Sequence, residues 1–183
     1  IRWEASGAMS TIKVDTVQTT GGVTLISDPE ANFEIDCFRL TADHSSDGTI
    51  TSNWERADDA SFAKIGTGLT ESSGIFTFPR TGLYQILGMT RIFTTNDDEA
   101  AKFKLEVTIN NSDYDVVAAA SVGDGTTDNV FQGSSLLALV NVTNTTNVKI
   151  RWVAQSLATG SLVEGSSTEN RTAFICERKG PSQ

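Results

Sequence analysis

The chain has 183 residues, of which 14 are basic and 23 acidic, so its formal net charge is −9. This length predicts one main domain with a substantial buried core. The acidic balance repels phosphate backbones and anionic lipids, and no apolar run approaches the ~20 residues that a membrane-spanning helix needs. We therefore expect neither nucleic-acid binding nor membrane insertion.

Composition divides the chain into four parts. Residues 1–8, IRWEASGA, precede Met9 and look like an added leader, so they are left out of the fold prediction. Residues 9–32 form an N-terminal segment of short strands or linker. Residues 33–179 form the predicted main domain, and residues 180–183 a tail.

The sequence of the main domain predicts a series of consecutive β-strands. In residues 102–109, KFKLEVTI, apolar and polar side chains alternate with a period of two, which is typical of a strand with one face in water. Gly, Thr, Asn, Asp and Ser fill the connections, and the only helix candidate is the weak one at residues 57–65, ADDASFAKI. We predict an all-β sandwich or jelly roll of about ten antiparallel strands. The predicted strands include residues 33–41, 48–54, 74–78, 82–93, 102–109, 114–122, 134–142, 147–154 and 171–178.

Two of these strands are apolar on both faces. In residues 83–93, LYQILGMTRIF, one side carries Leu83, Leu87, Met89 and Phe93, and the other carries Tyr84, Ile86 and Ile92. Residues 134–142 repeat this pattern, with Leu137 and Leu139 opposite Leu136, Ala138 and Val140. Other residues must cover both faces of such an antiparallel strand to shield them from water. The first cover is the sandwich core. For the second cover we favour a neighbouring subunit, which makes Leu83, Leu87, Met89 and Phe93 a candidate subunit interface. A long loop or the N-terminal segment is the alternative.

The sequence offers little for catalysis. Its one histidine, His44, lies in the turn-like stretch ADHSSDG, and nothing in the pattern places a nucleophile and an orienting carboxylate beside it. Paired carboxylates can hydrolyse glycosidic bonds, but Asp58–Asp59 and Asp97–Asp98–Glu99 lie in polar connections, which predicts solvated loops. We expect no enzymatic activity and no cofactor.

Metal and thiol chemistry have few candidates. Residues 123–129, GDGTTDN, offer the oxygen ligands Asp124, Asp128 and Asn129 to calcium, without the twelve-residue EF-hand spacing, and are a weak candidate site. The two cysteines, Cys37 and Cys176, are too few for a disulfide framework or a structural zinc site. We expect two buried thiols, with a single disulfide as the alternative.

One stretch carries a family resemblance. In FTFPRTGLY, Phe76 is followed by five residues, Gly82, one residue and Tyr84, and Leu69 lies seven residues before Phe76. This spacing resembles the central signature of C1q-like domains, which share a jelly roll with tumour necrosis factor. The pattern departs further on, because aromatic residues are expected at the places of Ile86 and Gly88. It also departs upstream, where an Asn or Asp is expected at the place of Lys64 and a Phe at that of Asp58. The resemblance implies a compact homotrimer whose long central strands pack about a threefold axis.

A second resemblance lies at the N-terminus. Residues 9–25, MSTIKVDTVQTTGGVTL, resemble the opening of virion structural proteins from tailed phages of marine bacteria. The resemblance implies two short strands joined by a turn at residues 19–22, and contacts of this segment with other virion proteins. With a C1q-like head it implies a non-enzymatic virion surface protein, the distal head of a fibre or appendage.

Such a head is expected to bind a glycan or protein on the host-cell surface through its loops. The candidate recognition loops are residues 94–100, with Asp97, Asp98 and Glu99, residues 123–129, with Asp124 and Asp128, and residues 158–170. Two alternatives stay open. One is a purely structural trimer that decorates a capsid or caps a fibre, and the other is a secreted C1q-like binding module of a cellular organism.

Overall fold

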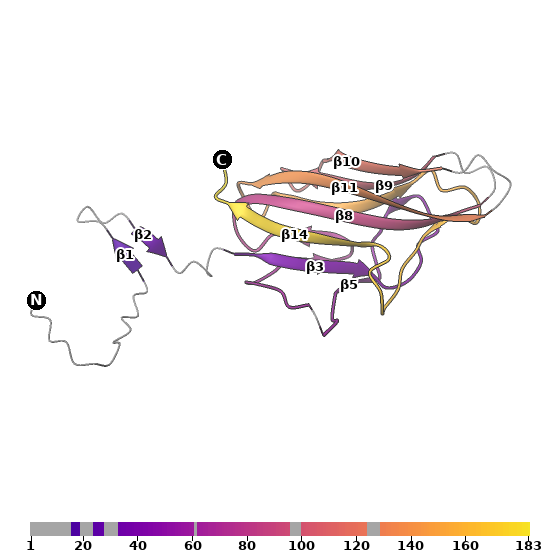
Figure 1. Ribbon diagram of the computed structural model, residues 1–183. Helices are drawn as coiled ribbons and strands as arrows, with labels where there is room; N and C mark the ends of the chain where they lie inside the picture. Colours follow the sequence, from indigo (N-terminus) through magenta and orange to yellow (C-terminus); the bar gives the residue numbers. More distant parts are fainter. Residues whose placement is uncertain (1–15, 19–23, 28–32, 61, 96–99, 124–128) are drawn as a thin grey trace, which may run out of the picture. The chain divides into compact units, whose positions relative to one another are not determined.

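A computed structural model gives the protein's fold (Figure 1), and it describes residues 16–18, 24–27, 33–60, 62–95, 100–123 and 129–183. The chain forms two compact units, residues 1–32 and residues 33–183. In the first unit, β1 (Thr16–Gln18) and β2 (Thr24–Ser27) pair antiparallel, so the two predicted short strands are present. The residues between them lie outside the described ranges.

The second unit is a sandwich of two antiparallel sheets, which confirms the predicted all-β jelly roll. In Figure 1, β14 lies between β8 and β3 in one of these sheets. This β8 sheet has the order β11 (Val130–Val142), β8 (Gly82–Thr94), β14 (Ala173–Gly180), β3 (Ile35–Leu40) and β5 (Trp54–Arg56), with β13 (Leu162–Val163) paired to β8. The other, the β9 sheet, has the order β10 (Tyr114–Val122), β9 (Ala101–Thr108), β12 (Lys149–Gln155), β7 (Ile75–Thr77) and β6 (Thr70–Ser72), with β4 (Gly48–Thr49) paired to β12.

One local prediction was wrong. The single strand expected at residues 48–54 is two pieces in different sheets: β4 pairs with β12, and β5 pairs with β3. Asn53, between them, has a φ of 64°, a left-handed conformation that interrupts an extended strand. Residues 57–65, the helix candidate, form no helix at their described positions, and Ile65 makes an isolated bridge with Ile35 instead.

Aromatic side chains from both sheets fill the centre of the sandwich. The Phe76 ring lies 4.9 Å from that of Phe174, 5.1 Å from that of Phe38 and 5.6 Å from that of Trp54, each in an edge-to-face arrangement. Trp152 stacks on Phe103 in the same core. Neither Trp54 nor Trp152 is therefore available as a platform for a sugar ring.

The FTFPRTGLY stretch joins the two sheets. Phe76 and Phe78 enter the core from β7 and the residues after it, and Tyr84 enters the core from β8. The Tyr84 hydroxyl donates a hydrogen bond of 2.9 Å to the Arg80 carbonyl, which closes the connection between the two strands. At Gly82 a Cβ atom would lie only 2.7 Å from the Gly180 carbonyl oxygen, so this position has no room for a side chain.

Gly88 gives a direct test of the packing between the sheets. A Cβ atom there would lie 2.5 Å from Cη2 of Trp152 on the opposite sheet. We expect Gly88→Ala to lower the free energy of unfolding by about 2 kcal/mol and the Tm by about 4–8 °C, because the indole must shift within a filled core. Gly133→Ala is the matched control, since the nearest atom to its Cβ would be 3.8 Å away. Equal Tm shifts for the two variants in thermal denaturation would contradict this packing.

Candidate functional site

The outer face of the β8 sheet is the candidate site. β8 is thirteen residues long and its burial alternates, so that Tyr84, Ile86 and Ile92 enter the core. The residues between them point away from the core. The four that the sequence singled out all lie there: Leu87 and Met89 are exposed, and Leu83 and Phe93 are half-buried.

Neighbouring strands extend this apolar surface. Leu137 of β11 and Ile175 of β14 both lie in register with Leu87, so the three side chains form a row across three strands. A second pair, Phe131 and Phe93, brings two rings to within 4.9 Å between centroids. We call this surface the apolar face. Its exposed members are 44–63% accessible: Leu87, Met89, Phe131, Leu137, Leu139 and Ile175.

The apolar face contains a hollow of about 260 Å³. It forms because Ser135 and Ala173, two small residues, lie in register on either side of Met89. The volume is below the roughly 300–1,000 Å³ of usual small-molecule pockets, and the lining is mostly apolar. It therefore suits protruding apolar side chains of another protein surface better than it suits a cofactor. The lining residues are Cys37, Leu87, Gly88, Met89, Ser135, Asn170, Ala173, Phe174 and Ile175.

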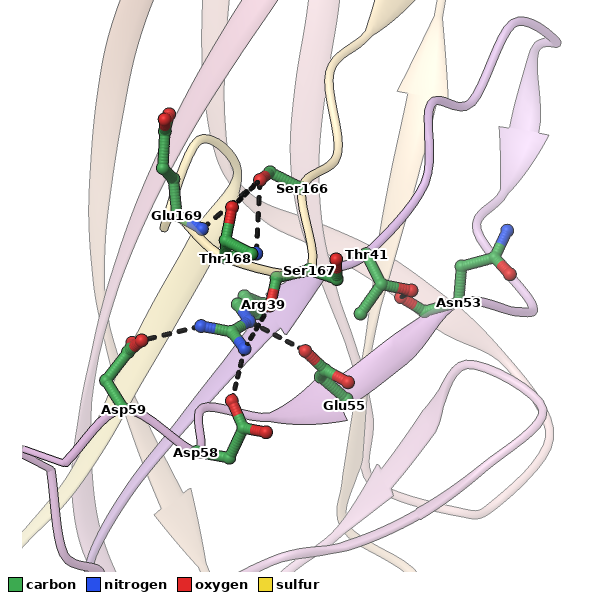
Figure 2. Close-up of polar contacts among 10 residues, drawn as sticks. All are labelled: Arg39, Thr41, Asn53, Glu55, Asp58, Asp59, Ser166, Ser167, Thr168 and Glu169. Carbon is green, nitrogen blue, oxygen red and sulfur yellow. Dashed lines mark hydrogen bonds and ion pairs between the residues drawn. The ribbon is translucent and has the colours of Figure 1, made fainter.

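A buried arginine closes the β3 side of this face. Arg39 lies in register with Ala173 and is 1% exposed, although it belongs to the outward-pointing residues of β3. Figure 2 shows its guanidinium between three carboxylates: Nε donates to Glu55 at 2.7 Å, Nη1 donates to Asp59 at 3.0 Å, and Nη2 donates to Asp58. Nη2 also donates to the Ser167 carbonyl at 2.6 Å.

These contacts keep Arg39 charged. Burial by itself lowers the pKa of Arg39, but the hydrogen bond with Glu55 and the charges of Glu55, Asp59 and Asp58 outweigh it, so that the pKa is raised overall. The arrangement fixes the loops that carry Asp58 and Ser167 to the end of the apolar face. It is a structural ion-pair cluster, and Asp58–Asp59 is not the purely solvated loop that the sequence suggested.

The two cysteines do not form a disulfide. Cys37 of β3 pairs with Ile175, and Cys176 of β14 pairs with Asp36, so the thiols lie on neighbouring strands but on opposite faces of the sheet. Cys176 is in the core and Cys37 lines the hollow. Burial, and then the charge of Asp36, raises the pKa of Cys37 to about 11, and burial raises that of Cys176 well above its usual value.

These raised pKa values predict an alkaline loss of stability. An unfolded thiol ionises near pH 9, while the folded thiols stay protonated, so stability is complete below pH 9 and falls as the pH rises toward 11. For each thiol, we expect the free energy of unfolding to fall by up to about 1.4 kcal/mol per pH unit in this window, because the thiol ionises only in the unfolded chain. Urea denaturation at pH 8, 9 and 10 measures the slope. A Cys37→Ala/Cys176→Ala variant with the same slope as the natural sequence would contradict the assignment.

The other predicted site residues are spread over the fold. Leu69, Phe76, Gly82 and Tyr84, which carry the family resemblance, are all buried between the sheets. Asn129 is exposed just before β11. The candidate residues Asp97, Asp98, Glu99, Asp124 and Asp128 lie outside the described residues. Within the described ranges, no group of three or more His, Cys, Asp or Glu side chains is placed to hold a metal ion.

His44 is more enclosed than the predicted loop histidine. It is half-buried, and its backbone forms a bridge with Val163 through two hydrogen bonds. Ser45 and Ser46 beside it are exposed.

No helix in the described part of the chain could cross a membrane.

Sequence reasoning missed the Arg39 cluster entirely. Its one local signal was the acidic pair Asp58–Asp59 shortly after β5, but Ser167 is 128 positions from Arg39 in the chain. Alternation in residues 171–178 places Ile175 on the face opposite Phe174 and Cys176, but only the register shows that it joins Leu87 and Leu137 in one row.

Comparison with known proteins supports the fold. No family model matches the chain, and a search of curated protein sequences found no match. Among solved structures, the chain is similar to Eiger TNF from S. frugiperda, with a TM-score of 0.57 and 12% sequence identity. The similarity covers 83% of this chain and 96% of that one. At this identity the comparison shows a shared fold, the tumour-necrosis-factor-like jelly roll.

Proposed function

We propose that this protein is a non-enzymatic, homotrimeric binding head, carried at the distal end of a phage fibre or another virion appendage. The observation that carries the trimer is the apolar face. Leu87, Leu137 and Ile175 form a continuous row of exposed side chains, and the described residues of the same domain leave them uncovered. Contiguous apolar surface of this kind marks a protein interface.

A ring of three copies needs a second, different surface on each copy. Interfaces in a closed trimer are heterologous, so the apolar face of one copy must contact another part of its neighbour. The β10 edge of the β9 sheet offers such a part. Val116 and Val117 are about half exposed there, beside a β-bulge that interrupts pairing with β9. Two separate apolar surfaces favour a ring over a twofold dimer, as does the resemblance to C1q-like and tumour-necrosis-factor-like domains.

The binding role rests on the loops at one end of the sandwich. Thr94 at the end of β8 pairs with Val130 at the start of β11, and Thr95 bonds with Thr159 and Ser161 of the connection after β12. The start of residues 94–100, the end of residues 123–129 and the start of residues 158–170 therefore lie at the same end of the sandwich, while β13 within residues 158–170 pairs with β8. Loops on a rigid scaffold are suited to recognition, and three copies raise weak affinity through avidity. The placement on a virion rests on the resemblance of residues 9–25.

A cell-binding assay tests this role. Fluorescently labelled protein is mixed with a panel of marine bacteria and the bound fraction is measured against protein concentration. We expect saturable binding to particular strains, and much weaker binding by a variant that cannot form the trimer. A stable trimer without affinity for any strain would contradict the binding role and favour the purely structural alternative.

A further inference from the structure

The outer face of the β9 sheet carries a line of positive charge. Lys102 and Lys104 on β9, and Lys149 and Arg151 on β12, alternate with residues that enter the core. All four are partly exposed on the side turned away from the apolar face. We call these four residues the basic face. The feature is unexpected on a chain of net charge −9.

Strand register places these cations in successive rows. Lys102 pairs with Gln155, and Lys104 pairs with Val153. The next pair is Glu106 with Arg151, and the last is Thr108 with Lys149. Each row therefore holds one cation, and four rows spaced by two residues cover about 20 Å along the strands.

Three of these cations have no partner in the described structure. Elsewhere basic side chains are engaged: Arg56, Arg91 and Lys179, for example, pair with carboxylates, and Lys64 donates to two backbone carbonyls. Lys102, Lys104 and Lys149 make no hydrogen bond or ion pair within the described ranges.

Arg151 has a different role in the line. It is held by Glu106 at 2.7 Å, and its guanidinium lies 4.0 Å from the centre of the Tyr114 ring. The basic face therefore keeps a net positive charge after its one ion pair is counted. Among the described residues, no carboxylate has to be displaced for an anionic ligand to reach the three lysines.

We propose that the basic face binds a linear anionic polysaccharide, whose carboxylate, sulfate or phosphate groups lie along the row of lysines. This names the ligand class of the proposed binding head, and it rests on that proposed function. Single cations in successive rows, divided between the neighbouring strands β9 and β12, match a chain whose charges are widely spaced. Duplex nucleic acid, with one charge per ~1.7 Å, meets much stronger repulsion from the acidic remainder of the protein. The basic face lies on the β9 sheet, whereas the apolar face lies on the β8 sheet.

Affinity electrophoresis with defined polymers tests the proposal. The probes are polygalacturonate and dextran sulfate, with neutral dextran of similar length as the reference. We expect both anionic polymers to retard the protein, neutral dextran to leave it unaffected, and added salt to weaken the effect. Lys102→Gln, Lys104→Gln and Lys149→Gln should each weaken binding about two- to fivefold, and the triple variant at least about tenfold.

Lys179→Gln is the matched control, because it removes the same charge from the β8 sheet, where Lys179 pairs with Glu177. It should bind like the natural sequence. No retardation by either anionic polymer, or a triple variant that binds like the natural sequence, would overturn the inference. Tighter binding to a DNA duplex than to polygalacturonate would overturn the choice of a glycan.

Cell binding separates this inference from the proposed function. If the triple variant remains a trimer and still binds cells as the natural sequence does, the basic face is not the recognition surface, and the binding head stands. If the natural trimer binds polygalacturonate but no cell, the proposed function fails, while the ligand chemistry of the basic face is retained.

Discussion

Glutamate at both Leu87 and Leu137 is expected to convert the trimer into folded monomers. The two side chains lie in register at the middle of the apolar face and are about half exposed in a single chain. A lone chain therefore tolerates the charges, because water still reaches them. In a trimer each interface would bury the two introduced carboxylates, at a cost of several kcal/mol per charge. Light scattering on a sizing column measures the mass of the variant, and circular dichroism shows whether it keeps its fold.

The control for this pair is Ile109→Glu. Ile109 is 74% exposed and lies in the turn after β9, away from the apolar face. The same change of leucine-sized apolar side chain to carboxylate there should leave the mass unchanged. If Leu87→Glu/Leu137→Glu has the same mass as the natural sequence, the apolar face is not the subunit interface.

Truncating the central aromatic ring is expected to have the largest effect on stability. Phe76 is fully buried and contacts the rings of Phe38, Trp54 and Phe174. Phe76→Ala removes these contacts and leaves a cavity between two sheets that cannot close together. We expect the free energy of unfolding to fall by about 3–5 kcal/mol and the Tm by about 10–15 °C.

The matched control is Ile109→Ala, which shortens an exposed apolar side chain. It should change the free energy of unfolding by no more than about 0.5 kcal/mol. Urea denaturation of both variants gives the comparison. A loss below about 1 kcal/mol for Phe76→Ala would mean that the ring does not hold the two sheets together as described.

Period-two alternation was enough to predict most of the long strands and the two-faced strands. It placed Leu83, Leu87, Met89 and Phe93 on one side of their strand, because in an extended chain side-chain direction depends only on the local sequence. The same rule predicted the two sides of residues 134–142. These positions form the largest part of the apolar face.

The features that the sequence did not predict depend on contacts between distant parts of the chain. No local pattern could show that Ile175 stands beside Leu87, because strand order and register are set by the whole sandwich. Arg39 shows the same limit, since its polar partners come from β5, from the loop after it and from the connection before β14. The predicted strand at residues 48–54 is divided at Asn53 by a left-handed backbone conformation, which the alternating sequence around it does not indicate.

We propose that three copies of this chain assemble through the apolar face, and the solution mass of the natural sequence tests this assembly most directly. Light scattering on a sizing column, over a range of concentrations, should give a mass near three times that of the 19.6 kDa chain. A single-chain mass at every concentration would contradict the trimeric head. The row of Leu87, Leu137 and Ile175 would then need a different cover.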